Sequence, residues 1–305
     1  MKKVILSAAA LMFGMVAFAQ NNSDVKQTGN GNGTTVNQTG MNTSDVDQEF
    51  TNNTAKVDQT GNNMSTVNQL GDVNGNSNSG MNNEADVDQT SGGAAVQQVS
   101  NIQQQGDGNY AKAEQIGSAN DSFIQQGNNE EAEDNSADVY QNGDSNESNV
   151  LQRWDNNVAN IDQVGNNNSV SLEQAAGPNQ TAGNSSTISQ DGNNNSAVSY
   201  QETAANPGVM NTEVVTQMDD YNYSELNQIG DGNSSTVTQS GAFDNLGTNG
   251  RSNEAYVDQN GEGNTSNITQ GAQGSIAADN MATVNQSGML GNMSTITQME
   301  LTLLL

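Results

Sequence analysis

The sequence predicts an all-β protein, a β-solenoid of stacked strand-turn-strand coils with cross-β hydrogen bonding between coils. A segment of the form Asn-x-small-x-aliphatic-x-Gln returns along almost the whole chain, from Asn21–Gln27 to Asn292–Gln298. The step from one Gln of this segment to the next is most often about 11 residues, which is too short for a helical repeat. Two such arms would form one coil of about 22 residues.

Each arm is expected to be a β-strand with one buried face. The restricted residues fall at every second position, which is the period of a strand whose alternate side chains point to one side. The Asn, the small residue, the aliphatic residue and the Gln would therefore point inward. The positions between them, expected to face water, include Asp45, Asp47, Lys56, Asp58, Thr66, Asn68, Asp86, Asp88, Lys112, Glu114, Thr236 and Thr238.

The inward amides need hydrogen-bond partners, because burying an unpaired amide costs about 1–3 kcal/mol. Coils stacked ~4.8 Å apart supply them, since the same Gln in successive coils can donate on one side and accept on the other. The residues predicted to form such ladders are Asn21, Gln27, Asn32, Gln38, Gln48, Asn53, Gln59, Gln69, Gln89, Asn157, Gln163, Asn168, Gln174, Gln190, Gln228, Asn233, Gln239, Gln259, Asn264, Gln270, Gln286, Asn292 and Gln298.

Short connections between the arms are expected to be tight turns. Four residues usually follow each Gln, and the second of them is often Gly, which adopts positive φ at little cost. The expected turn glycines are Gly29, Gly40, Gly61, Gly106, Gly165, Gly192, Gly230 and Gly261.

The repeat contains about 22 recognisable arms, which gives about eleven coils and a rod ~50 Å long. Longer steps, such as Gln69 to Gln89, keep the arm motif at both ends, so we expect the extra residues to loop out at a turn. Between Gln89 and Gln115 the pattern is least regular, with Gly92 in the Asn position and Ala113 in the aliphatic position.

A second irregularity is that two inward positions carry polar residues of unusual kinds. Glu213 occupies an inward small-residue position and Ser199 an inward aliphatic one. The coils that contain them should be weaker than their neighbours.

Residues 1–19 have the pattern of a secretory signal peptide: Lys2 and Lys3, then an apolar core, then a small-residue exit at Ala17–Ala19. The apolar run is too short for a typical transmembrane helix. The mature chain, residues 20–298 as repeat and 299–305 as an apolar tail, is expected to be secreted. Removing the leader takes away two lysines and no acid, so the formal charge changes from −28 to −30.

Composition narrows the function classes. A chain with such a large negative formal charge is not expected to bind nucleic acid, because both would repel each other. With Cys 0 and His 0, the usual nucleophiles, general bases and metal ligands are missing, so we expect neither an enzyme nor a cofactor. The high polarity by itself would suggest disorder, but the strict repeat favours cross-β order instead.

Residues Asn21 to Gln38 follow the pattern Ser/Asn-x5-Gln-x-Gly-x2-Asn-x5-Gln, as do the stretches Gln163–Gln174 and Gln228–Gln239 from their first Gln onward. This pattern resembles the curlin repeat, and the resemblance covers nearly all of the mature chain. It implies an extracellular functional amyloid that forms fimbrium-like fibres, scaffolds biofilm and supports adhesion to host or abiotic surfaces. It also implies a head-to-tail homopolymer that works with a curli-type secretion channel, a chaperone and a nucleator.

The chain departs from the curlin pattern at its start, because the first arm begins almost at Gln20, where curlins have a non-repeat segment that addresses the export channel. The resemblance therefore does not determine whether this chain is exported by the same route. Whether the chain is a major subunit or a nucleator, the handedness of its solenoid and the role of the tail also stay open.

Other classes remain as alternatives. A soluble secreted solenoid with capped ends is one, although neither terminus carries a cap-like helical pattern. An ice-binding solenoid would need a regular threonine face, and Asp45, Lys56 and Glu114 interrupt it. The outward carboxylates could bridge calcium ions, but they are more typical of a solvated face that opposes lateral clumping. Trp154, with Tyr140, Tyr200 and Tyr256, is expected at the surface or in a turn.

Overall fold

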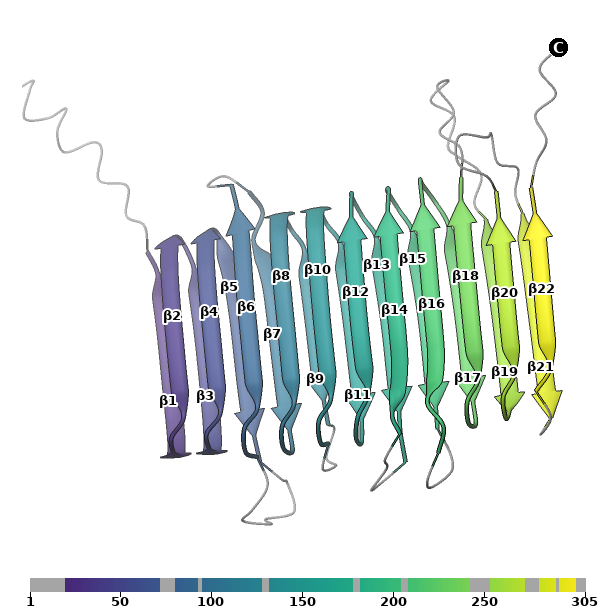
Figure 1. The fold of residues 1–305 in the computed structure, drawn as a ribbon. Helices are drawn as coiled ribbons and strands as arrows, with labels where there is room; N and C mark the ends of the chain where they lie inside the picture. Colours follow the sequence, from purple (N-terminus) through teal and green to yellow (C-terminus); the bar gives the residue numbers. More distant parts are fainter. Residues whose placement is uncertain are drawn as a thin grey trace, which may run out of the picture.

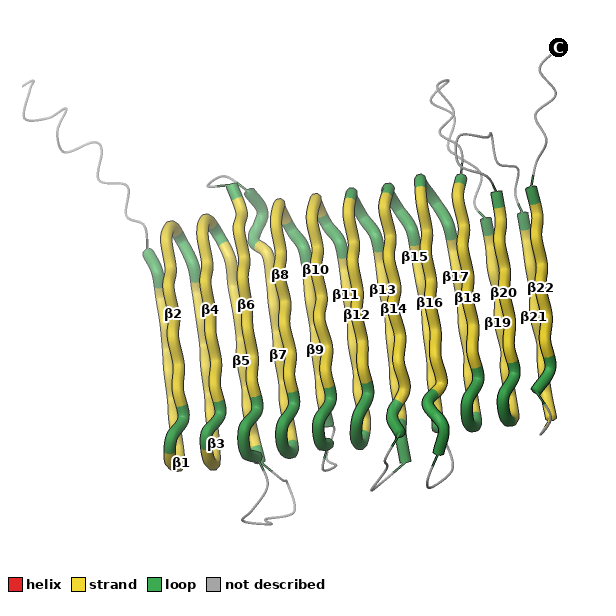
Figure 2. Tube along the Cα trace, in the orientation of Figure 1, coloured by secondary structure: helices red, strands yellow, loops and turns green. Residues whose placement is uncertain are grey.

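A computed structural model of the chain is a long, flat β-solenoid in which the coils follow one another from the N-terminal to the C-terminal end (Figure 1). It describes residues 20–71, 80–92, 95–127, 132–177, 182–203, 208–241, 253–271, 280–288 and 291–299. The expected leader, 1–19, and residues 300–305 of the expected tail lie outside these ranges. Everything within them is strand, turn or loop, without a helix (Figure 2).

The odd-numbered strands of the described chain are β1 (Asn22–Asn30), β3 (Thr43–Thr51), β5 (Asn63–Leu70), β7 (Gln98–Gln105), β9 (Asp121–Gln126), β11 (Glu147–Arg153), β13 (Ser169–Ala175), β15 (Ser196–Glu202), β17 (Tyr223–Ile229), β19 (Glu254–Gly261) and β21 (Met281–Gly288). The even-numbered strands are β2 (Gly33–Gly40), β4 (Thr54–Gly61), β6 (Glu84–Ser91), β8 (Tyr110–Ser118), β10 (Ser136–Asp144), β12 (Val158–Val164), β14 (Asn184–Asp191), β16 (Asn211–Met218), β18 (Ser234–Ser240), β20 (Thr265–Gln270) and β22 (Met293–Gln298).

The strands form two parallel sheets of 11 strands each. Sheet A holds the odd strands in sequence order, and sheet B holds the even ones. One odd strand and the next even strand make a coil, so each strand pairs with its equivalents in the coils before and after it. The predicted class, an all-β solenoid of stacked coils of about 22 residues, is confirmed.

The core is a thin slab between the two sheets. Burial alternates along the strands, as in β4, where Ala55, Val57 and Gln59 are buried and Lys56 is exposed. One continuous cluster of small and aliphatic side chains extends from Val46 to Val284, with Val36 and Ile296 packed against its two ends. Along the described strands, inward and outward positions therefore alternate as the repeat predicts, except at the position assigned to Gly92.

Longer steps between arms leave the strand register intact. Gln59 pairs with Gln89 across 30 residues of sequence, and the flanking pairs Val57–Val87 and Ala55–Ala85 stay in line. β5 ends at Leu70 and β6 begins at Glu84, so the strands on either side of this step are complete. Residues 72–79, on which the expectation of a looped-out insertion falls, lie outside the described residues.

The assignment of Gly92 to an inward Asn position is wrong. Gly92 lies outside the strands, and Gln98 occupies the Asn position of β7, where it pairs with Asn63. Gln104 then takes the Gln position opposite Gln69. A Gln can replace Asn here because it carries the same amide donor and acceptor. Ala113 does occupy the aliphatic position of β8 and is fully buried.

Candidate functional site: the amide ladders and the open ends

Two unbroken glutamine ladders run the length of the solenoid, one in each sheet. In sheet A, Nε2 of Gln27 donates to Oε1 of Gln48, and Gln48 donates in the same way to Gln69. This direction continues coil by coil to Gln286 in sheet A and to Gln298 in sheet B, with N–O distances of 2.6–3.0 Å. Within these two ladders, each glutamine that has a following coil donates toward the C-terminal end.

Two asparagine ladders lie beside the glutamine ladders and run in the opposite direction. The backbone N–H and the Nδ2 of Asn42 both donate to Oδ1 of Asn21 in the preceding coil. Asn53 likewise donates its backbone N–H to Asn32, and the direction persists to Asn280 and Asn292. The asparagine ladders therefore donate toward the N-terminal end.

Backbone partners fix the orientation of these amides. The acceptor on Asn21 faces the backbone N–H of Asn42, which can only donate, so this side chain cannot be reversed. Nε2 of Gln48 also donates to the carbonyl of Gly33, which can only accept. Backbone groups cannot exchange donor and acceptor roles, so the ladder directions are properties of the fold.

The structure places every predicted ladder residue at an inward position of its row. Ladder members absent from the predicted set occupy the same rows: Asn42, Asn63, Asn83, Gln98, Gln104, Asn109, Gln115, Asn120, Gln126, Asn135, Gln141, Asn146, Gln152, Asn184, Asn195, Gln201, Asn211, Gln217, Asn222, Asn253 and Asn280. Most could be found by counting six residues back from each Gln, because the same alternation places an amide there.

The turn glycines stack on one another from coil to coil. Gly143, Gly165 and Gly192 all have positive φ, and a Cβ on Gly165 would collide with the carbonyl oxygen of Gly192. The predicted turn glycines all have positive φ, and Gly117 and Gly288 share it without having been predicted. The close approach of turn backbones, besides the φ value, explains why glycine stands there.

The two ends of the solenoid are open strand edges within the described chain. β1 and β2 at one end pair only with β3 and β4, and β21 and β22 at the other pair only with β19 and β20. β1 is exposed along its whole length, and 43% of Val25 is accessible. The inward positions of β22 are also accessible, whereas those of β21 are buried. Unpaired edges of this kind can template another chain.

One coil carries a buried acid. In the coil of β15 and β16, the hydroxyl of Ser199 donates to the carboxyl of Glu213, and both residues are buried. Burial raises the pKa of Glu213 to about 7, and the hydrogen bond from Ser199 opposes this only in part. Its second oxygen, Oε1, has no partner within the described residues.

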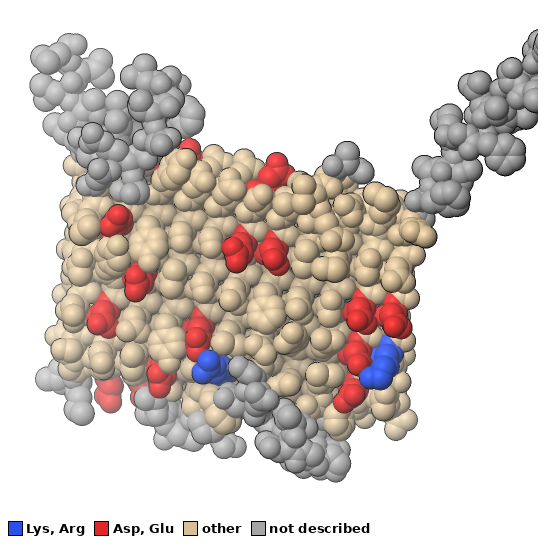
Figure 3. All heavy atoms as spheres, turned by 180° about the vertical axis from the view of Figure 1, so that it is seen from behind, with Lys and Arg blue, Asp and Glu red and all other residues tan. Residues whose placement is uncertain are grey.

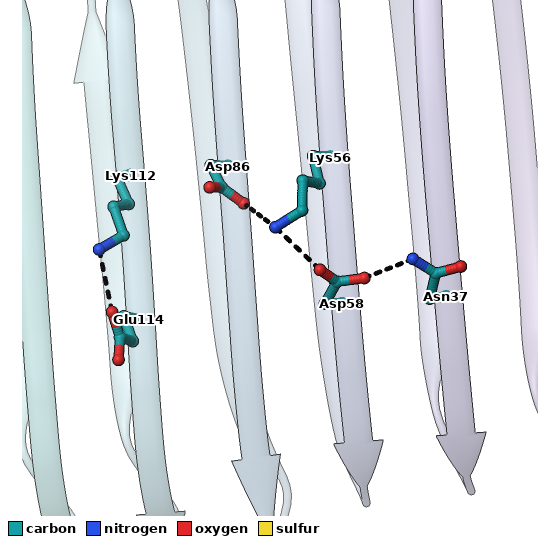
Figure 4. Close-up of polar contacts among 6 residues, drawn as sticks. All are labelled: Asn37, Lys56, Asp58, Asp86, Lys112 and Glu114. Carbon is teal, nitrogen blue, oxygen red and sulfur yellow. Dashed lines mark hydrogen bonds and ion pairs between the residues drawn. The ribbon is translucent and has the colours of Figure 1, made fainter.

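Acidic side chains are scattered over the face shown in Figure 3, with a few basic residues among them. On sheet B, Lys56 lies 2.8 Å from Asp58 and 3.2 Å from Asp86, and Asp58 accepts a hydrogen bond from Asn37 (Figure 4). The ion pair with Lys56 lowers the pKa of Asp58. These side chains tie adjacent coils together at the surface, where such pairs are worth about 0–1 kcal/mol each.

The surface aromatics lie where expected. Trp154 stands in a turn with φ 61°, and Tyr140, Tyr200 and Tyr256 are outward and only partly exposed. The rings of Tyr223 and Tyr256, on β17 and β19, are 5.8 Å apart.

Neither a metal centre nor a membrane helix is found in the described part of the chain. No three acidic side chains there are grouped closely enough to hold a metal ion, and no helix there is long and apolar enough to cross a membrane. The chain matches no protein-family model and has no significant match among curated proteins.

Proposed function

We propose that this protein is a secreted, structural subunit that assembles end to end into extracellular cross-β fibres, in the manner of curlins. Such fibres would scaffold a biofilm matrix and support cell aggregation and adhesion. Export would use a curli-type channel with a chaperone, and a nucleator would start growth. The observation that carries the proposal is the pair of open ends, which present the same inward rows of Asn, Gln and aliphatic residues as the interior coils.

The energetics of stacking support this proposal. Each interior coil has neighbours on both sides that complete its four amide ladders, while each terminal coil lacks one neighbour within the described chain. Within the described residues, the missing neighbour leaves one side of each terminal ladder amide and strand edge without a hydrogen-bond partner. A second copy of the chain supplies the same rows at the same spacing, so its addition completes the bonds that an interior coil already makes.

The test is fibre formation by the purified chain starting at Gln20. We expect unbranched fibres in electron micrographs, a meridional reflection near ~4.8 Å and growth that speeds up when preformed fibres are added. A chain that folds as a solenoid but stays monomeric at high concentration would contradict the proposal. Expression of the full chain in a curli-secreting cell would then show whether the fibres appear outside the cell.

A soluble ice-binding solenoid is the second candidate, and one observation favours it. The outer face of sheet B carries hydroxyl side chains in register over five consecutive strands: Ser189, Thr216, Thr238, Thr269 and Thr297. The charged residues that interrupt such a face lie on the earlier strands β4 to β12. Thermal hysteresis of a monomeric preparation measures this activity, and its loss in Thr238→Lys would assign it to this face.

A further inference from the structure

The opposite directions of the two kinds of ladder give the solenoid two different ends. At the N-terminal end, Oε1 of Gln27 and of Gln38 accepts from no described residue, because no described coil precedes these side chains, which donate into the solenoid. The backbone N–H groups of Asn21 and Asn32 likewise have no described acceptor. This end therefore offers acceptors in its glutamine rows and donors in its asparagine rows.

At the C-terminal end the pattern is reversed. Nε2 of Gln286 and of Gln298 each donate to a backbone carbonyl, which leaves one N–H on each amide. The side chains of Asn280 and Asn292 donate to Asn253 and Asn264 in the preceding coil. Because no described coil follows them, Oδ1 of Asn280 and of Asn292 accepts from no described residue. This end offers donors in its glutamine rows and acceptors in its asparagine rows.

We propose that the inward rows, each continued in the direction of its ladder, set the polarity and the register of the contact between two copies of this chain: β21 of one copy pairs in parallel with β1 of the next, and β22 pairs with β2. This inference rests on the proposed function. In this register Gln286 donates to Gln27 of the next copy, and Gln298 donates to Gln38. The backbone N–H of Asn21 and of Asn32 in the next copy donate to Asn280 and Asn292.

The apolar rows and surface charges fit the same register. Val284 meets Val25, and Ile296 meets Val36, so the aliphatic rows continue across the junction. Among outward positions, Asp24 and Lys26 of β1 meet Thr283 and Asn285 of β21, so no like charges face each other. A contact between two equal ends would pair the terminal strands antiparallel, so each glutamine row would meet an asparagine row and each aliphatic row a row of small residues. Neither the amide ladders nor the apolar core would continue across such a junction, and a buried amide left without a partner costs about 1–3 kcal/mol.

Blocking one end at a time tests this polarity. The N-blocked variant carries Val25→Lys and Gln27→Lys, and the C-blocked variant carries Ile296→Lys and Gln298→Lys. These four side chains are at least partly exposed on the terminal strands, so both variants should keep the β-sheet circular dichroism of the wild-type monomer. If either variant loses this circular dichroism signal, the single substitutions Gln27→Lys and Gln298→Lys are used instead to block the N-terminal and the C-terminal end.

Each blocked variant alone is expected to remain monomeric, because its intact end finds no complementary end. An equal mixture should form a dimer with one copy of each variant and nothing larger, measured by native mass spectrometry with one variant isotope-labelled. Wild-type chain in parallel should form fibres. If wild type forms fibres but a blocked variant dimerises with itself, or the mixture forms no dimer, the polarity inference is overturned. If wild type forms no fibres at all, the proposed function fails instead.

Discussion

The hydroxyl of Ser199 and the carboxyl of Glu213 contact each other inside the eighth coil, where the neighbouring coils place aliphatic side chains beside a small one. Leu172 and Leu226 flank Ser199 in its row, and Ser186 and Ser235 flank Glu213. The smaller Ser199 makes room for the longer acid. The side chains packed around this pair bring no charge, since only burial and Ser199 shift the pKa of Glu213.

We expect the free energy of unfolding to fall as the pH rises from about 4.5 to about 7, the ordinary and the folded pKa of Glu213. In this window the folded carboxyl keeps its proton while the unfolded one loses it, so the unfolded state gains. At ~1.4 kcal/mol per pKa unit the loss totals about 3 kcal/mol. Above pH 7 the dependence on this group levels off.

Urea unfolding of freshly prepared monomer at pH 5 and pH 8 measures this effect. Glu213→Gln should remove most of the difference between the two pH values and be the more stable protein at pH 8. Glu262→Gln, an exposed turn residue, is the control and should behave as wild type. An unchanged pH dependence in Glu213→Gln would show that Glu213 is not the responsible group.

The glutamine ladder should matter more than the surface charges next to it. Gln163 links Gln141 to Gln190, so Gln163→Ala removes a buried side chain and leaves two amides short of a partner. We expect a loss of about 2–4 kcal/mol and slower fibre growth.

Asp162→Ala, one residue away and facing outward, is the matched control, with an expected change within about 0.5 kcal/mol. The same comparison can be made with Gln174→Ala and Glu173→Ala, although Glu173 also loses its exposed ion pair with Arg153. Denaturation midpoints and elongation rates give both quantities. Equal effects of the inward and outward changes would contradict the ladder account.

Glycine stacking in the turns predicts a site-specific penalty. Gly165→Ala must adopt φ 108° and would collide with the backbone of Gly192, so we expect a loss of at least about 2 kcal/mol. Gly33→Ala has open space around its Cβ and no positive φ, so it should be neutral or stabilising by up to about 1 kcal/mol. Thermal unfolding compares the two, and a neutral Gly165→Ala would mean that the turn can relax.

Fibre growth is expected to be faster at pH 5 than at pH 8, because the formal charge of −30 on the chain from Gln20 declines toward the sequence pI of about 4.1 and acidic subunits then repel each other less. The measurement should use Glu213→Gln, so that the buried acid does not contribute. Added salt should reduce the difference, because it screens charge at either pH. Equal or slower elongation at pH 5 would argue against repulsion as the limit on growth.

Much of the fold could be predicted from the sequence because a strand has a period of two. The spacing of Asn32, Thr34, Val36 and Gln38 already assigns an inward face, and Gly40 marks where the chain must turn. Gln98 escaped prediction because it replaces Asn with a longer amide in an arm whose spacing from its neighbours is irregular. No local signal distinguishes that Gln from the one that ends an arm.

The sequence by itself determined the solenoid, its inward and outward faces and the amides that line it, because these depend only on local periodicity and turn chemistry. Tertiary structure decided the rest. Gln and Asn amides can each point either way along a ladder, and only the backbone groups of the neighbouring coils select a direction. In the same way, Ser199 and Glu213 meet only after two arms fold over each other, which brings together side chains that their spacing in sequence leaves unrelated.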